Sequence, residues 1–267
     1  MSELTGLRAL VTGGSSGIGA AIARELAARG ATLVLTARRQ AQLDEVAATC
    51  STKTETIAAD LGTADGARVV WDRAIAGGAI DILVNNAGFG AFRPFGRTEW
   101  LRDVEMIELN MTALVYLSKQ FIGARESRRG YLLNIGSIGA YQSVPNMALY
   151  SASKAFVRNF TEALHDELRG SELSATCVCP GGTKTEFHAA AGAGDYSWLA
   201  NASMMSAERV AAIAVRAMLA RKRTVIPGLI NKLSCWSVRL VPRRFASWMT
   251  RRVLGTPKLA LPPRSIS

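Results

Sequence analysis

Residues 9–26, which read ALVTGGSSGIGAAIAREL, indicate how the chain begins to fold. The stretch opens with a short apolar run that ends at Thr12 and is typical of a buried strand. Glycine and serine residues then interrupt the run, as they do in a tight turn. Beyond the turn, apolar side chains recur with the spacing of one helix face, at Ile18, Ala21, Ile22 and Leu26. The stretch therefore predicts a strand, a turn and a helix.

The same alternation of apolar runs and helical spacing continues along the chain. Further runs stand at residues 32–36, 56–60, 80–84, 131–135, 175–179 and 224–227, and helical spacing is clearest at 100–120 and 149–168. Because the runs are continuous, both faces of these strands are expected to be buried, as in a parallel sheet. We predict an α/β fold: a doubly wound, Rossmann-type parallel sheet of about seven strands in one domain, 1–228, followed by a basic helical C-terminal extension, 229–267.

Length and composition exclude several classes of protein. With 267 residues, 49% of them hydrophobic and 20% charged, the chain can bury a core and is neither disordered nor fibrous. It has no run of about 18 apolar residues, so the sequence predicts no membrane span. The first residues do not resemble a signal peptide. With four cysteines and no export signal, we expect reduced thiols and a cytoplasmic protein.

The net charge of +11 is distributed unevenly. From Arg209 onward there are thirteen Lys or Arg residues and no Asp or Glu, whereas the first 208 residues have 19 Lys and Arg against 21 Asp and Glu. The basic character therefore belongs to the end of the chain. Because no nucleic-acid recognition motif accompanies it, we expect no nucleic-acid partner.

The glycine-rich turn stands between the first strand and the first helix, where parallel sheets bind nucleotides. Backbone without a Cβ atom can approach a pyrophosphate closely, and the following helix offers free N–H groups and the positive end of its dipole. The spacing GxxxGxG lacks the GK[ST] of phosphate-transferring loops, which disfavours ATP hydrolysis. The alternative is that the glycines only cap the helix. We favour a nucleotide site made by Gly13, Ser15, Ser16, Gly17, Ile18 and Gly19.

The end of the second strand indicates which dinucleotide is bound. Dinucleotide folds usually carry an Asp or Glu there, which holds the adenosine ribose hydroxyls. Here the sequence is Ala37-Arg38-Arg39, without an acid. Two guanidinium groups suit a ribose 2′-phosphate, so the pattern favours NADP(H). The alternative is that both arginines only solvate a helix start, where cations are mildly unfavourable.

Tyr150 and Lys154 are four residues apart in a predicted helix and therefore share one face. An ammonium group beside a phenol stabilises the phenolate and lowers a pKa that is ordinarily about 10. Ser137 follows the fifth strand, where its hydroxyl could hold a carbonyl oxygen. Each feature alone is common, since such a pair is usually a solvated helix face and such a serine is usually a cap.

In order and spacing together, these residues resemble the short-chain dehydrogenase/reductase family, from about Leu7 to Gly228. The matching motifs are Thr12-Gly13-x-x-x-Gly17-x-Gly19, Asp60-Leu61, Asn85-Asn86-Ala87-Gly88, Asn110, Ser137, Tyr150-x-x-x-Lys154 and Pro180-Gly181-x-x-x-Thr185. The end of the second strand resembles the NADP-preferring branch. One departure is Gly136, where many relatives carry Ser, and we expect it not to affect the chemistry.

The resemblance implies a role for each matched residue. Tyr150 would be the general acid in carbonyl reduction and Ser137 would position the carbonyl. Lys154 would tune Tyr150 and bind the nicotinamide ribose, and Asn110 would hold a water that links Lys154 to solvent. Further cofactor contacts implied in this way are Asp60 and Leu61 with the adenine, Asn86, Ala87 and Gly88 on the adenosine ribose side, and Pro180, Gly181, Thr183 and Thr185 with the carboxamide.

The remaining candidates are weaker. Cys177 and Cys179 lie in a predicted buried strand, and the two histidines, His165 and His188, lack ligand spacing, so we predict no metal. Residues 187–206 are rich in Ala, Gly and Ser and stand where lids over active sites tend to lie. An ordinary surface loop is the alternative there.

We therefore expect an NADPH-dependent oxidoreductase that reduces a ketone or aldehyde of a lipophilic substrate, or runs the reverse alcohol oxidation, as a homodimer or homotetramer. The alternative is a non-catalytic NADP(H)-binding regulatory or scaffold protein of the same fold. The presence of Asn110, Ser137, Tyr150 and Lys154 argues against it, because a binding module does not need that set.

The C-terminal extension interleaves Trp and Leu with Lys and Arg and has no acid, which is typical of a helix at a membrane surface. Pro242 should divide it into two short helices. We therefore consider peripheral membrane contact. The alternative is that its apolar face closes over the substrate pocket or a neighbouring subunit.

Overall fold

One parallel sheet forms the centre of the molecule. The computed structural model describes residues 3–125, 128–183, 204–238 and 240–254. Seven parallel strands are ordered β3-β2-β1-β4-β5-β6-β7. They are β1 (Arg8–Thr12), β2 (Thr32–Ala37), β3 (Thr54–Ala58), β4 (Ile82–Asn85), β5 (Gly130–Ile135), β6 (Leu173–Val178) and β7 (Thr224–Val225). The predicted doubly wound sheet is confirmed.

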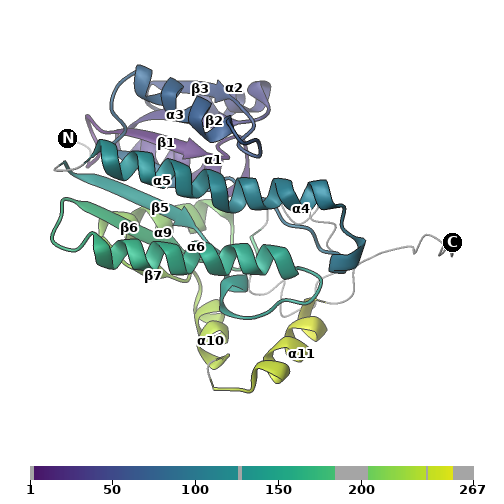
Figure 1. The fold of residues 1–267 in the computed structure, drawn as a ribbon. Helices are drawn as coiled ribbons and strands as arrows, with labels where there is room; N and C mark the ends of the chain where they lie inside the picture. The colour runs from purple at the N-terminus through teal and green to yellow at the C-terminus, as the bar shows by residue number, and fades with distance from the viewer. Residues whose placement is uncertain (1–2, 126–127, 184–203, 239, 255–267) are drawn as a thin grey trace, which may run out of the picture.

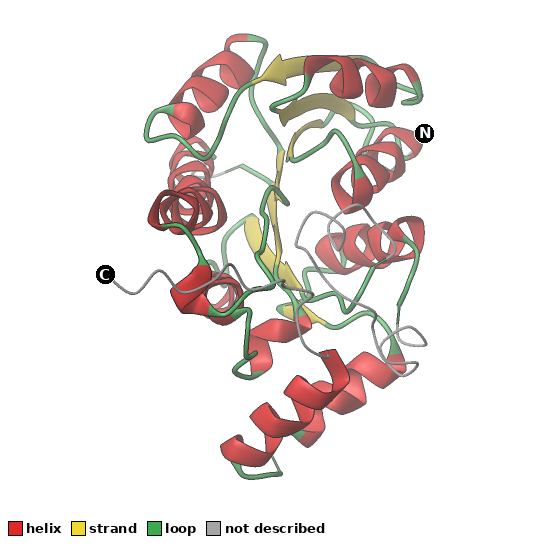
Figure 2. Cartoon of the chain, turned by 90° about the vertical axis from the view of Figure 1, so that its right-hand side faces the viewer, coloured by secondary structure: helices red, strands yellow, loops and turns green. Residues whose placement is uncertain are grey.

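Helices cover both faces of the sheet, which Figure 2 shows nearly edge-on. One face carries α1 (Gly17–Ala28), α2 (Gln40–Ala48) and α9 (Ala207–Leu219); the other carries α3 (Gly66–Ala76), α5 (Ala113–Ala124) and α6 (Ala148–Glu167). The apolar positions that predicted α1 face the core, since Ile22 and Leu26 are fully buried. Burial of such side chains stabilises the fold by about 1.5–3 kcal/mol each.

The direction of the strands brings the site residues together. Val11 of β1 pairs with Val84 of β4, and Asn85 pairs with Asn134 of β5, so the carboxyl ends of neighbouring strands lie level with one another. The loops that follow these strands therefore leave from one edge of the sheet. This is the edge where open α/β sheets bind their ligands.

The helix expected at 100–120 is interrupted. The structure has α4 (Trp100–Ile107), a π-helical turn (Glu108–Thr112) and then α5. Asn110 lies inside the wider turn, and its side chain bonds to Phe89 and Ser153 of other segments. Such π turns are rare and are often found at functional sites.

The end of the chain forms two helices, α10 (Leu229–Ser237) and α11 (Arg243–Leu254), on either side of Pro242 as predicted. Figure 1 shows them together below the sheet, on the side of β7 and remote from β3 and α2. None of the helices that the structure describes combines the length and apolar character needed to cross a membrane.

Candidate active site

The glycine-rich turn after β1 is tied to the end of β4. Thr12 Oγ1 donates to the carbonyl oxygen of Val84 at 3.2 Å and accepts from the backbone N–H groups of Asn86 and Ala87, both at 3.0 Å. Asn86 Nδ2 donates to the carbonyl oxygens of Thr12 at 3.0 Å and Gly13 at 3.1 Å. The turn and the Asn86–Gly88 loop therefore form one rigid unit.

Two glycines make this close approach possible. A Cβ atom on Gly13, where φ is +64°, would stand 2.8 Å from Asn86 Nδ2, and one on Gly19 would stand 2.1 Å from the carbonyl oxygen of Gly13. Ser16 precedes α1, and its side chain makes no capping hydrogen bond among the described residues. Because the first-turn N–H groups of a helix lack partners within the helix, this end of α1 can accept a pyrophosphate.

The predicted adenosine-side residues lie at the ends of β2 and β3. Ala37, the last residue of β2, pairs with Ala58, the last residue of β3. Arg38 and Arg39 directly follow β2 and are exposed. Two residues beyond β3, Asp60 turns back and accepts a hydrogen bond from Gly62 N at 2.9 Å, and Leu61 is buried. The arginines and the Asp60-Leu61 pair thus lie after neighbouring strands of the sheet.

Tyr150 and Lys154 share one face of α6, as their spacing predicts. Lys154 Nζ lies 5.9 Å from the centre of the Tyr150 ring. Tyr150 is half-buried, and a Cβ atom on Gly90 would stand 2.8 Å from its Cδ2 atom. The loop after β4 can therefore pass close to the phenol ring only because residue 90 has no side chain.

The ammonium group of Lys154 is buried, with only 6% of the residue exposed. Nζ donates to the carbonyl oxygen of Ile135, at the end of β5, at 2.8 Å. Burial lowers the pKa of Lys154 to about 8, because an interior position disfavours the charged form. The amine can therefore gain or lose a proton near neutral pH.

Asn110 lies next to this lysine. Its Oδ1 accepts from Phe89 N at 3.1 Å, while Nδ2 donates to the Phe89 carbonyl oxygen at 3.0 Å and to Ser153 Oγ at 3.1 Å. A Cβ atom on Gly88 would stand 2.9 Å from Asn110 Oδ1 and 3.5 Å from Lys154 Nζ. The Asn110 oxygen and the Lys154 ammonium therefore both lie beside Gly88.

Ser137 directly follows Gly136 at the end of β5. Its Oγ accepts from Gly139 N at 3.1 Å and caps a short 3-10 turn, Ile138–Tyr141. The bond uses a lone pair, so the hydroxyl hydrogen can still donate to a substrate oxygen. A Cβ atom on Gly139 would stand 3.5 Å from Ser137 Oγ and 4.0 Å from Tyr150 Cε1. The structure therefore brings all four predicted catalytic residues to one edge of the sheet.

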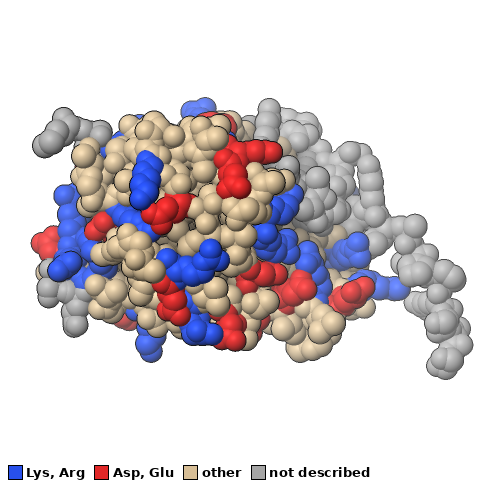
Figure 3. Space-filling view, turned by 90° about the horizontal axis from the view of Figure 1, so that it is seen from above, with Lys and Arg blue, Asp and Glu red and all other residues tan. Residues whose placement is uncertain are grey.

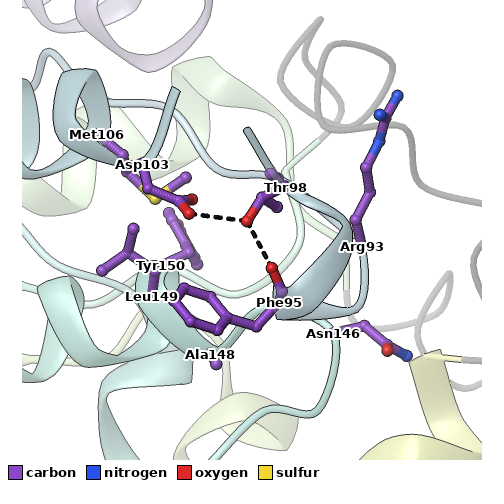
Figure 4. A pocket seen from close by; sticks show the side chains of 10 residues that line it. Arg93, Phe95, Thr98, Asp103, Met106, Asn146, Ala148, Leu149 and Tyr150 are labelled. Carbon is purple, nitrogen blue, oxygen red and sulfur yellow. Dashed lines mark hydrogen bonds between the residues drawn. The ribbon is translucent and has the colours of Figure 1, made fainter. Parts of the chain in front are cut away.

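A small, open pocket lies beside Tyr150 (Figure 4). Its lining is Ala91, Arg93, Phe95, Thr98, Asp103, Met106, Asn146, Ala148, Leu149 and Tyr150. The hydroxyl of Thr98 joins the carboxylate of Asp103, at 2.8 Å, to the carbonyl oxygen of Phe95, at 2.7 Å. The Asp103 carboxylate is buried and hydrogen-bonded to Thr98. Half of the residues that line the pocket are apolar.

The loop after β6 contains Pro180, Gly181 and Thr183. Thr183 is buried, and its Oγ1 lies 3.3 Å from the carbonyl oxygen of Gly181. Thr183 also forms a β-bridge with Met205. Thr185 and most of the predicted lid, 187–206, lie outside the described residues.

Sequence reasoning missed Asn231 of α10. Only 3% of this residue is exposed, and its Nδ2 donates to the carbonyl oxygen of Pro227 at 2.9 Å. A Cβ atom on Gly181 would stand 2.5 Å from the same Nδ2 atom. The C-terminal extension therefore packs directly on the loop predicted to meet the nicotinamide. The only signal in the sequence is an Asn near the start of a helix whose other residues there are mostly apolar.

Two buried thiols explain the departure at Gly136. Cys177 Sγ and Cys179 Sγ are 3.6 Å apart, and a Cβ atom on Gly136 would stand 2.8 Å from the second and 3.1 Å from the first. The space beside residue 136 is thus filled by sulfur. All four cysteines have free thiols, and the described residues contain no cluster of His, Cys, Asp and Glu that could bind a metal ion.

The fold and this site define an oxidoreductase of the nicotinamide-dependent type, and comparison with known proteins gives its family. Residues 8–196 match the family model for short chain dehydrogenase. The chain therefore belongs to the short-chain dehydrogenase/reductase family. The match ends before α9, so α10 and α11 lie beyond it.

Individual relatives agree with this assignment. The chain is 36% identical over 195 residues to an uncharacterized oxidoreductase of Myxococcus xanthus (strain DK1622), which covers 71% of this chain and 77% of that protein. It is also 36% identical over 190 residues to 11-beta-hydroxysteroid dehydrogenase 1A of Arabidopsis thaliana, covering 69% and 54%. A short-chain dehydrogenase from Sphingobium yanoikuyae in complex with NADPH superposes with a TM-score of 0.75 at 30% identity, covering 92% and 93% of the two chains.

Proposed function

We propose that this protein is an NADPH-dependent reductase of ketones or aldehydes on lipophilic substrates, and that it can run the reverse alcohol oxidation. The observation that carries this proposal is the convergence of Tyr150, Lys154, Ser137 and Asn110 at one edge of the sheet, where Tyr150 also lines a small pocket. A purely NADP(H)-binding scaffold would need the glycine-rich turn but not this set.

Tyr150 is the proton donor in the proposed reaction. The Ser137 hydroxyl donates to the substrate carbonyl oxygen and holds it near the phenol. As negative charge develops on that oxygen, Tyr150 Oη transfers its proton to it. The chemistry that NADPH supplies when bound is a hydride for the carbonyl carbon. The Lys154 ammonium stabilises the phenolate left behind, since an opposite charge favours the charged form of a neighbour.

Asn110 keeps this proton path in place. Its amide joins the loop at Phe89 to Ser153 of α6, one residue before Lys154. The lysine is buried, so it needs a route to solvent in order to be reprotonated. We propose that a water at the Asn110 oxygen supplies that route.

The residues present fit a bound NADP(H). Gly13 and Gly19 allow the turn to fold closely against Asn86 at the start of α1, and Gly17 adopts a φ of +55°. The first-turn N–H groups of this helix suit a pyrophosphate. The exposed Arg38 and Arg39, with no acid at the end of β2, suit a ribose 2′-phosphate. Asp60 and Leu61 would meet the adenine, and the Asn86–Gly88 loop would meet the adenosine ribose. Pro180, Gly181, Thr183 and Thr185 would bind the carboxamide.

A lipophilic substrate is supported by the pocket. Ala91, Phe95, Met106, Ala148 and Leu149 supply apolar lining around Tyr150. The relative from Arabidopsis thaliana bears the name of a hydroxysteroid dehydrogenase, and a ketosteroid is one apolar carbonyl compound of this kind. Apolar lining with a few polar groups is typical of small-molecule sites.

A direct test is to screen carbonyl compounds with the purified protein and NADPH and to follow the loss of nicotinamide absorbance. The panel should contain ketosteroids, long-chain ketones and aldehydes, and short polar ketones as matched controls. We expect turnover of apolar ketones or aldehydes and little turnover of the polar controls. NADPH binding without turnover of any compound would favour the scaffold alternative.

A further inference from the structure

Helices α10 and α11 each pack on the rest of the protein, which we call the body, through one face. Asn231 and Cys235 on α10 are buried, as are Ala246 and Thr250 on α11, each pair one helical turn apart. The hydroxyl of Ser247 also hydrogen-bonds to that of Ser143 in the segment before α6. These contacts define the inner faces of the two helices.

The outer faces carry large apolar side chains that are 41–72% exposed. They are Leu229, Ile230, Leu233 and Trp236 of α10, Phe245, Trp248 and Met249 of α11, and Leu240 of the turn between the helices; we call this set the tail face. Thirteen large apolar residues are exposed in the described part of the chain, and eight of them belong to this set. An exposed apolar patch of this kind usually marks an interaction site.

The tail face is accompanied by positive charge only. Residues 229–254 contain six Lys or Arg and no Asp or Glu. Lys232, Arg244 and Arg252 are exposed, and the Arg252 guanidinium lies 5.3 Å from the centre of the Trp248 ring. The surface at the top of Figure 1 carries charges of both signs. Figure 3 views this surface from above and shows Lys and Arg interspersed with Asp and Glu.

We propose that the tail face binds the surface of an anionic lipid bilayer. Apolar and indole side chains enter the interface between headgroups and acyl chains, while cations beside them contact the lipid phosphates. Trp is enriched at this depth because its ring is apolar and its N–H is polar. Six cations without an acid complement the charge of such a surface.

A second copy of the chain is the less suitable occupant. In a two-fold symmetric dimer the same patch lies on both sides of the interface. Such a dimer would bring together two segments, each with six cations in its sequence and no acid to pair with them. The charge pattern that suits anionic lipid therefore opposes self-association through this face.

The helices that carry the tail face pack with their inner faces on loops near the proposed site, since Asn231 of α10 lies against Gly181 and Ser247 of α11 bonds to Ser143. When the tail face is bound to a bilayer, the loops around the pocket of the protein would thus lie close to the membrane surface. This arrangement suits the lipophilic substrate proposed above. Lipid binding itself does not depend on the reaction, so a vesicle assay can fail while the reductase proposal stands.

The test is co-sedimentation of the full-length protein with vesicles of phosphatidylcholine and phosphatidylserine, and with vesicles of phosphatidylcholine alone. We expect binding to the anionic vesicles in low salt and release in high salt, which screens the charges. Substitution of Lys232, Arg244 and Arg252 by Gln should lower the partition coefficient roughly 100-fold, at about 1 kcal/mol for each cation. Trp236→Ser with Trp248→Ser should lower it by about tenfold or more.

Matched controls come from exposed residues of the body. Trp100→Ser with Leu101→Ser removes apolar groups that are 71% and 75% exposed, and Lys53, Arg68 and Arg169 to Gln removes three exposed cations. Both controls should bind the vesicles as the wild type does, and NADPH binding by every variant reports folding. No binding to anionic vesicles in low salt, or equal partition of tail and control variants, would overturn the proposal. So would a dimer that dissociates on substitution of the two tail tryptophans, without vesicle binding.

Discussion

Asn231 of α10 lies against Gly181 in the loop after β6, so closely that a Cβ atom on the glycine would stand 2.5 Å from the amide nitrogen. Fifty residues separate the two along the chain. The contact joins the C-terminal extension, which lies beyond the family match, to a loop proposed to bind the nicotinamide. The shape of this loop therefore depends on the extension.

Asn231→Ala tests this dependence. The change removes the amide that fills the space beside Gly181 and its bond to Pro227, at a cost of about 1–3 kcal/mol for a buried hydrogen-bonded group. We expect NADPH affinity to fall about tenfold, measured by fluorescence titration. Cys235→Ala, one turn along the same inner face, is the control and should leave the affinity within about threefold of wild type. Equal losses in both variants would mean that α10 acts only through general stability.

Gly136→Ala should reveal the tight packing against Cys179. The new methyl group would meet the sulfur atoms of Cys177 and Cys179, and overpacking costs about 1–3 kcal/mol. We expect the free energy of unfolding in urea to fall by about 2 kcal/mol, and by roughly half of that when Cys179→Ala is already present. Additive losses in the double-mutant cycle would refute the contact.

Lys154→Met should stabilise the protein while it abolishes turnover. Burial lowers the pKa of Lys154 to about 8 from 10.5, so the wild type carries a cost for the buried charge below about pH 8. Substitution by Met removes this cost but also removes the hydrogen bond to Ile135. The free energy of unfolding should therefore rise by about 2 kcal/mol at pH 7.

The sign of the pH dependence is specific to this lysine. Between about pH 8 and 10.5 the unfolded chain binds more protons at residue 154 than the folded chain does, so the cost disappears as pH rises. The advantage of Lys154→Met in urea unfolding should therefore shrink over this window. Burial also raises the pKa of Cys235, but that thiol is common to both proteins and cancels in the difference. A constant advantage would contradict the shifted pKa.

Arg38→Gln with Arg39→Gln should change the choice of cofactor. Charge-assisted hydrogen bonds are worth about 1.5–3 kcal/mol each, and exposure reduces this value, so NADPH affinity should fall by up to about 100-fold. NADH affinity should hardly change, because NADH has no 2′-phosphate. Arg68→Gln in α3 is the control for loss of an exposed cation. Equal binding of NADH and NADPH by the wild type would overturn the proposed phosphate contact.

The sequence was sufficient to predict the sheet because its signals are local. Continuous apolar runs mark strands that are buried on both faces, and Ile22 and Leu26 repeat with the helical period. Tyr150 and Lys154 could be paired for the same reason, since four residues in a helix fix a shared face.

Most contacts that sequence reasoning missed join distant segments. Asn134 accepts from Asn85 at 2.9 Å and donates to Thr161 at 2.9 Å, which ties β4, β5 and α6 together behind the site. No periodicity in the sequence predicts a hydrogen bond between such buried polar groups. The π turn at Asn110 is equally hidden, because the apolar pattern of α4 and α5 continues through it.

Tyr150→Phe tests most directly whether Tyr150 donates the proton. The change removes one hydroxyl and keeps the ring that packs against Gly90. With a reactive ketone and NADPH, we expect turnover to fall at least about 1000-fold, at the upper part of the range for general acid catalysis, while NADPH affinity stays within about threefold of wild type. Near wild-type turnover by Tyr150→Phe would contradict the account.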